Sequence, residues 1–185
     1  MNNTNACIVR VGNLSNRYSD YRTIPNLEDN LSSALIMSYA QLGCVTEELL
    51  QDTMELSPVD FTASAMLILA KHHDPSYNVY HAFNRHKVTI AEITSVLSKI
   101  GIDVNVVSPE EMENIIKDTL DTNNKIYEVL KRTSIYDVNI KPRDLEKKTV
   151  FTDEILRQYD FEWPKITDDY IIGIMKNILK YVKGH

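Results

Sequence analysis

Apolar residues recur at three- and four-residue intervals through much of the chain, which is the spacing of one helical face. The run over 27–43 predicts an amphipathic helix that Gly43 ends. Similar runs predict helices after the capping residues Thr89, Ser108 and Thr167. Further helices are predicted over 58–70, 123–132 and 152–159.

Alternating or continuous apolar runs predict strands at 6–11, 53–56, 77–83 and 102–107. All of them precede the helix predicted after Ser108, so the chain is α/β in its first part and helical in its last part. The polar segment 133–150 has poor periodicity and is predicted to be a loop and a hinge.

The helix predicted over 58–70 has a well-defined start. Ser57 is the predicted N-cap, with Pro58 at the first helical position and Asp60 at the third. Residues 63–70 are apolar nearly all round, so we expect this helix to be buried.

Composition limits the classes of protein. A hydrophobic content of 43% and a charged content of 25% are typical of a soluble globular domain, and the net charge of −6 argues against a nucleic-acid partner. The chain has no apolar leader and no run of 18 apolar residues, which favours a cytoplasmic location without a membrane span. We expect the two cysteines, Cys7 and Cys44, to be reduced.

Several candidate sites have simpler explanations. None of the five glycines lies within six residues of another, so the sequence has no phosphate-cradling loop. Tyr127 and Lys131 have the Tyr-x-x-x-Lys spacing of short-chain dehydrogenases, but chance produces this spacing in many helices.

The histidines lack metal-ligand spacing, so we predict no metal site. Trp163 is expected to anchor the last helix on the core.

The polar segment that follows the first strand is a stronger candidate. Residues 13–20 come directly after the strand at 6–11, and ligands of open α/β sheets bind outside the carboxyl ends of the strands. By composition alone, an ordinary polar loop explains this segment equally well.

Four segments decide between these two interpretations by resemblance: IVRVGNLSNRYSD, ELSPVDFTASAM, YNVYHAFNRHKVTIAEI and FEWPKITDDYI. In order and spacing they resemble the C-terminal portion of thioester reductase-like proteins. These are extended short-chain dehydrogenase/reductases that terminate nonribosomal peptide synthetases, polyketide synthases and carboxylic acid reductases. The resemblance implies an α/β fold with residual Rossmann strands and a mainly helical substrate subdomain. It places the end of the Rossmann domain, with an interleaved substrate-domain segment, in 1–87 and the helical subdomain in 88–185.

The resemblance also implies an activity. The family uses NADPH to reduce a peptidyl or acyl thioester on the phosphopantetheine arm of a carrier protein, releasing an aldehyde or an alcohol. It places the cofactor-binding backbone at Gly12, Asn13 and Leu14, beside the nicotinamide. Arg17, Tyr18 and Val59 are the implied substrate-side residues.

The chain departs from the family at its start, because the cofactor loop and the catalytic residues would lie before Met1. We therefore expect no catalytic residue in this chain, no NADPH binding by the chain alone, and open edges on both sides of the strand at 6–11. Its implied partners are the missing N-terminal Rossmann half and a loaded carrier protein. The alternative is a non-enzymatic module that docks a carrier protein. A second departure is Tyr21, where many relatives have glycine, and Tyr127 with Lys131 does not match the catalytic pair.

Overall fold

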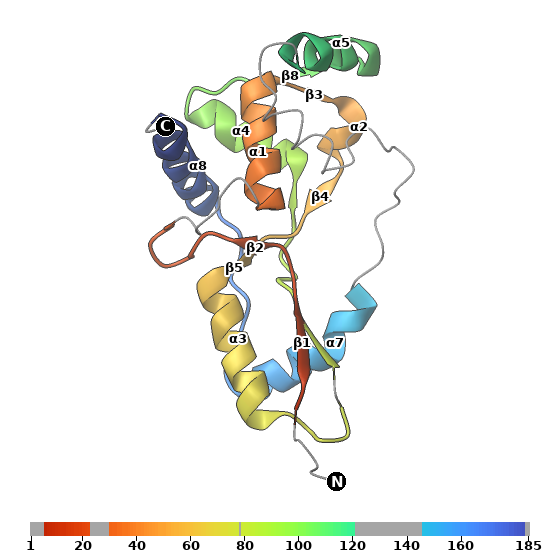
Figure 1. Ribbon diagram of the computed structural model, residues 1–185, viewed down its shortest axis with the longest axis vertical. Helices are drawn as coiled ribbons and strands as arrows, with labels where there is room; N and C mark the ends of the chain where they lie inside the picture. Colours follow the sequence, from red (N-terminus) through yellow and green to blue (C-terminus); the bar gives the residue numbers. More distant parts are fainter. Residues whose placement is uncertain (1–5, 23–29, 78, 121–145, 184–185) are drawn as a thin grey trace.

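The computed structural model describes residues 6–22, 30–77, 79–120 and 146–183 (Figure 1). The helix expected over 123–132, with Tyr127 and Lys131, lies outside the described residues. The helices are α1 (Leu31–Leu42), α2 (Glu47–Leu50), α3 (Val59–His72), α4 (Ile90–Lys99), α5 (Pro109–Leu120), α7 (Glu146–Gln158) and α8 (Asp168–Lys183). The strands are β1 (Ile8–Val11), β2 (Leu14–Ser15), β3 (Cys44–Thr46), β4 (Thr53–Met54), β5 (Ser57–Pro58), β6 (Val79–Ala82), β7 (Val88–Thr89) and β8 (Asn105–Val107).

The described strands pair two by two. β1 and β6 are parallel over their full lengths, from Ile8 opposite Val79 to Val11 opposite Ala82. The pairs β2–β5 and β3–β8 are also parallel, whereas β4 and β7 are antiparallel. Helix α3 precedes β6 in the chain and packs against both β1 and β6, as a crossover helix does in an α/β fold.

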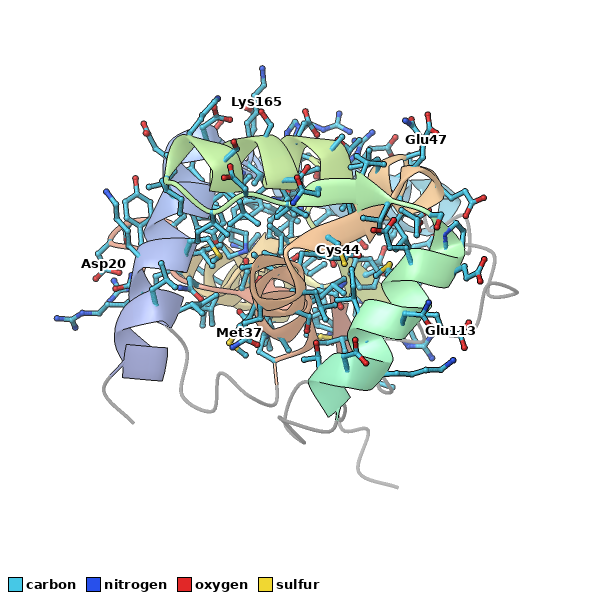
Figure 2. All side chains as sticks on the ribbon, turned by 90° about the horizontal axis from the view of Figure 1, so that it is seen from above. Asp20, Met37, Cys44, Glu47, Glu113 and Lys165 are labelled. Carbon is cyan, nitrogen blue, oxygen red and sulfur yellow. The ribbon has the colours of Figure 1, made fainter. Side chains whose placement is uncertain are left out.

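The larger of two main cores, here called the helical core, is built mainly by α1, α4 and α8. Its fully buried side chains include Ile93 of α4 and Ile174 of α8. Figure 2 shows α1 end-on with α4, α5 and α8 around it, and places the labelled Asp20, Glu47, Glu113 and Lys165 at the periphery. The four-residue spacing in the sequence thus brings one apolar face of each helix to a common centre.

The second core, here called the sheet core, lies around β6, α3 and α7 in the other half of the molecule (Figure 1). Its buried residues are Ala65, Leu69, Tyr80, Ala82, Leu156, Phe161 and Trp163. Both cores draw residues from before and after residue 87, and the domain boundary expected there stays a prediction.

Several helix ends match the sequence prediction. Gly43 follows α1 in the left-handed conformation, with φ of 62°. Thr89 caps α4 in a reciprocal capping box with Glu92, and Thr167 Oγ1 accepts a hydrogen bond from the Tyr170 N–H at 3.3 Å before α8. Local capping chemistry, readable from residue types, fixes these boundaries.

The predicted start and burial of α3 are wrong. Ser57 and Pro58 form β5, and the helix begins at Val59. The Ser57 hydroxyl is used elsewhere, because it bonds Glu55 and accepts the Asn84 N–H. One face of α3 is open, and Leu67 is 72% exposed and Met66 42% exposed.

Three further expectations need correction. Residues 146–150 are the first turn of α7 and not loop, because Thr149 is buried when the helix packs on β6. Trp163 packs edge-to-face on Phe161 in the sheet core, so it does not anchor the last helix. Strand β1 does not have two open edges, since β6 pairs with one of them.

No helix in the described part of the chain is both long and apolar enough to cross a bilayer.

Candidate functional site

The turn formed by Gly12, Asn13 and Leu14 lies at the carboxyl ends of β1 and β6. The Gly12 N–H donates to the Ala82 carbonyl at 3.2 Å, which extends the β1–β6 pairing by one residue. The Asn13 carbonyl accepts the Ser57 N–H at 2.8 Å, so the chain passes directly into the β2–β5 pair. This is the edge of a parallel sheet at which α/β proteins bind ligands.

Glu55 supports the turn from behind. Its carboxylate accepts the Asn13 N–H at 2.6 Å and the Ser57 hydroxyl through its other oxygen. A Cβ built on Gly12 would lie 2.7 Å from the Glu55 carboxyl carbon and closer still to both oxygens. A side chain at position 12 would therefore force this carboxylate to move from its present place.

Burial raises the pKa of Glu55 above its usual value, although several contacts act in the opposite direction. The hydroxyl of Ser57, backbone N–H groups of Asn13 and Asn84, and the charge of Lys87 all favour the ionised form. Glu55 is a site residue that no sequence motif predicted. The available signal was a carboxylate between the apolar Met54 and Leu56 in the strand predicted over 53–56.

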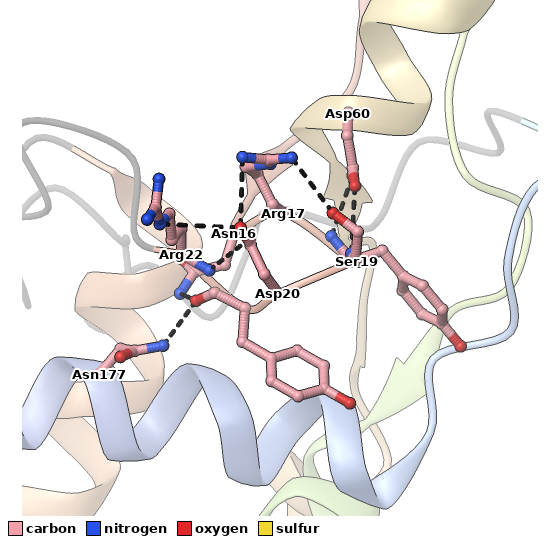
Figure 3. Close-up of polar contacts among 9 residues, drawn as sticks. Asn16, Arg17, Ser19, Asp20, Arg22, Asp60 and Asn177 are labelled. Carbon is pink, nitrogen blue, oxygen red and sulfur yellow. Dashed lines mark hydrogen bonds and ion pairs between the residues drawn. The ribbon is translucent and has the colours of Figure 1, made fainter.

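Asp60 shapes the loop that follows β2, as Figure 3 shows. Its two oxygens accept the backbone N–H groups of Tyr18 at 2.9 Å and Ser19 at 3.1 Å. Burial alone would raise the pKa of Asp60, but these hydrogen bonds, with one from Phe61, outweigh it and lower the pKa. The first turn of α3 thereby anchors the loop.

Two stacked tyrosines join this loop to the helical core. The Tyr170 hydroxyl of α8 donates to the Asn16 carbonyl at 2.6 Å and accepts from the Ser15 hydroxyl at 2.8 Å. Burial raises the pKa of Tyr170 far above its usual value, so the phenol keeps its proton. The Tyr18 ring stacks on Tyr170 with centroids 5.1 Å apart, and its hydroxyl donates to the Lys165 carbonyl at 3.0 Å.

The tip of the loop turns at Tyr21, which has a φ of 59°. Its carbonyl accepts the side-chain amides of Asn16 at 3.0 Å and Asn177 at 2.7 Å (Figure 3). The Tyr21 ring occupies the space that a Cβ on Gly173 would need. The left-handed backbone at Tyr21 is a conformation that glycine adopts without strain.

The structure brings some of the predicted site residues together and separates others. The segment 57–60, which contains Val59, lies against the turn at 12–14 and the loop after it. Val59 itself is half-buried as the first residue of α3. Arg17 is exposed and pairs with Asp20 at 3.3 Å, and Tyr18 is held against Tyr170. The structure therefore brings Gly12, Asn13 and Leu14 next to the segment that contains Val59, and Tyr18 adjoins the same segment through Asp60. Arg17 points to solvent.

A cavity of about 740 Å³ opens on the other side of Glu55, between the segment after β6, helix α7 and residues 161–163. Asp153 is buried in its wall, with Arg85 Nε 3.4 Å from Asp153 Oδ2. Burial raises the pKa of Asp153, whereas the charge of Arg85 lowers it. Asn84 also lines the cavity, and its side-chain amide donates to the carbonyls of Leu56 and Pro164.

Within the described ranges, no group of three or more His, Cys, Asp or Glu side chains is arranged to hold a metal ion. The site therefore consists of a backbone turn, its supporting carboxylate, an anchored loop and an adjoining cavity.

No family model and no curated protein matches the chain, but solved structures do. A thiolation-reductase di-domain from an archaeal non-ribosomal peptide synthetase matches with a TM-score of 0.78 and 24% identity, covering 98% of this chain and 37% of that one. The terminal R domain of the myxalamid PKS-NRPS pathway matches with a TM-score of 0.71 and 16% identity, covering 95% and 44%. The reductase domain of the aureusimine biosynthetic cluster matches with a TM-score of 0.70 and 23% identity, covering 95% and 45%.

Over at least 95% of its length the chain shares the fold of part of these three solved structures. The α/β fold expected from the sequence is thereby confirmed. The chain spans less than half the length of each of these three structures.

Proposed function

We propose that this chain is the C-terminal part of an NADPH-dependent reductase. The complete enzyme releases a carrier-protein-bound peptidyl or acyl thioester as an aldehyde or an alcohol. The observation that carries the proposal is a common fold over at least 95% of the chain with three synthetase reductase domains. At identities of 16–24% this likeness establishes the fold, and the activity is inferred from it.

The turn at Gly12, Asn13 and Leu14 fits the nicotinamide end of the cofactor. It presents backbone at the carboxyl ends of two parallel strands, and Asn13 is exposed. NADPH supplies the hydride when it is bound. In this proposal Gly12, Asn13 and Leu14 contact the nicotinamide, and Arg17, Tyr18 and Val59 lie on the substrate side.

The rest of the cofactor needs another set of residues. A pyrophosphate is usually held by closely spaced glycines at a helix start, and the five glycines of this sequence are widely separated. We propose that an N-terminal Rossmann part holds the pyrophosphate and carries the catalytic residues, either on the same polypeptide or on a partner.

Exposed apolar side chains on the elements around the sheet core support such an association. Ile8 and Val79 are opposite each other in the β1–β6 register and are 59% and 40% exposed. Leu67 and Met66 are exposed on the neighbouring α3. Apolar clusters of this kind mark surfaces that another protein part covers.

Isothermal titration with NADPH tests the proposal. The 185-residue chain alone is expected to give no binding heat, whereas the longest natural protein that contains it is expected to bind NADPH and to oxidise it with an acyl-pantetheine thioester. Micromolar binding by the chain alone would show that the cofactor site is complete within it. If no protein that contains the chain binds NADPH but a loaded carrier protein binds to it, the chain is the non-enzymatic docking module.

A further inference from the structure

Glu55 lies where the proposed cofactor turn and the cavity meet. One of its oxygens accepts the Asn13 N–H, and its side chain also lines the cavity of about 740 Å³. The carboxylate therefore connects a backbone segment proposed to contact the nicotinamide with the space beside it.

We propose that Glu55 is the positioning residue of this turn: its carboxylate fixes the Gly12–Asn13 peptide for contact with the cofactor. The inference rests on the proposed function of the turn. It does not require Glu55 to contact substrate or cofactor.

The geometry of the peptide explains how one carboxylate can set the turn. The described chain has no cis peptide bond, so the Asn13 N–H and the Gly12 carbonyl point in opposite directions. When Glu55 holds the N–H at 2.6 Å, the Gly12 carbonyl is directed away from the carboxylate. The missing side chain at Gly12 permits this approach, because a Cβ there would collide with Glu55.

A second network holds Glu55 in place. Its other oxygen accepts the Ser57 hydroxyl, and Ser57 Oγ in turn accepts the Asn84 N–H at 2.9 Å. Asn84 is almost fully buried, and its amide is fixed by the carbonyls of Leu56 and Pro164. Hydrogen bonds to both carboxylate oxygens thus fix the position of Glu55, as a positioning residue requires.

The charge of Glu55 matters, because a hydrogen bond from an N–H to a carboxylate is shorter and stronger than one to a neutral acid. Lys87 faces Glu55 and favours the ionised form. The other charged or titratable groups that line the same cavity are Arg85, His86, Asp153, Arg157 and Glu162, of which Arg85 and Asp153 pair with each other. Protonation of Glu55 is expected to loosen the turn, and burial moves this transition to a higher pH than that of an exposed glutamate.

The direct test is an NMR titration of the 185-residue chain, which follows the amide resonances of Gly12 and Asn13 with pH. Both are expected to shift together, with an apparent pKa above the usual range of a glutamate. Glu55→Gln keeps an oxygen for the Asn13 N–H but cannot ionise, so this transition should disappear while the spectrum stays folded. Glu162→Gln is the matched control, since Glu162 lines the same cavity and should leave the transition in place.

The second readout is made in the NADPH-binding protein that contains the chain. Glu55→Ala should weaken NADPH binding at least about tenfold at neutral pH. Glu55→Gln should weaken it less, to the level that the wild type reaches in acid, and this level should no longer change with pH. An Asn13 resonance that does not titrate, or one that still titrates in Glu55→Gln, overturns the role of Glu55. A titrating turn in a protein that binds no NADPH contradicts the proposed function and leaves the hold of Glu55 on the turn intact.

Discussion

The helical core and the sheet core differ in how completely they are covered. In the helical core α1, α4 and α8 enclose their apolar faces, and among the described side chains Leu31 and Val106 are the large apolar ones left exposed on the elements around it. The elements around the sheet core expose many more: Ile8, Met66, Leu67, Tyr77, Val79, Val150, Phe151 and Tyr159. The apolar side chains of the helical core are thus covered by its own helices, whereas the surface around the sheet core carries the exposed apolar side chains to which we propose that a further protein part binds.

The candidate site lies on the boundary between these two halves. Its turn follows β1 of the sheet core, and its loop is fastened to α8 of the helical core through Tyr170. The helical core thus supports the site rigidly. The sheet core places the site next to the surface at which we propose that the Rossmann part binds.

The prediction with the largest expected effect concerns the share of the helical core in the free energy of unfolding. Ile93→Ala removes a fully buried side chain and leaves a cavity, which should lower the free energy of unfolding by about 2–5 kcal/mol. Urea unfolding followed by circular dichroism measures this change. Trp163, the single tryptophan, lies in the sheet core and reports on that half by fluorescence. A fluorescence midpoint that does not move would show that the two cores unfold independently.

The second prediction concerns the link between the cores. Tyr170→Phe removes a buried hydroxyl that bonds the Asn16 carbonyl and Ser15, and should cost about 1–3 kcal/mol because both groups stay buried without it. Thermal unfolding measures the loss. Tyr18→Phe is the control, because the Tyr18 hydroxyl bonds an exposed carbonyl, and it should cost much less. Equal losses in both variants would contradict the role given to Tyr170.

The third prediction follows from the lowered pKa of Asp60. A carboxyl whose pKa is lower in the folded state stabilises the protein above its unfolded pKa, and this stabilisation disappears as the pH falls through the folded value. Asp60→Asn should therefore cost about 1 kcal/mol at neutral pH and progressively less in acid, a modest figure because the side chain is partly exposed to solvent. Melting temperatures of wild type and variant, measured from neutral pH into acid, test this trend. A difference in stability that stays constant with pH would contradict it.

The smallest effect on stability should come from the uncovered surface itself. Leu67→Ser changes a residue that is 72% exposed, so the isolated chain should keep its unfolding free energy to within about 0.5 kcal/mol. The same change should weaken association with the Rossmann part, which analytical ultracentrifugation or titration can measure. Unchanged association would remove α3 from the proposed contact surface.

The sequence predicts some elements of this fold better than others, for physical reasons. Helices with local signals, such as α1 before Gly43 and α4 after Thr89, lie where their caps place them, because capping depends on neighbours in the chain. The start of α3 was mispredicted because Ser57 takes part in a long-range network with Asn84. Burial of α3 was overestimated, since an apolar segment looks alike whether its own chain or another part covers it.

The candidate site shows the same division. The position of the turn at residues 12–14 follows from a strand and the glycine after it, so the sequence locates it. Glu55 lies 42 residues from Asn13 in the sequence, and Tyr170 lies 155 residues from Ser15. No local sequence pattern predicts these contacts. Residues of this kind are found only when the fold brings distant segments together.

The contact between Tyr21 and Gly173 suggests how such sites diverge. The ring of Tyr21 in the loop occupies the space that a side chain at position 173 of α8 would need. A larger residue at one position therefore requires a smaller one at the other. A relative with glycine at position 21 should therefore tolerate a bulkier residue at position 173. When distant homologues are aligned, these two columns are best judged as a pair, since either one alone would look like an unrelated exception.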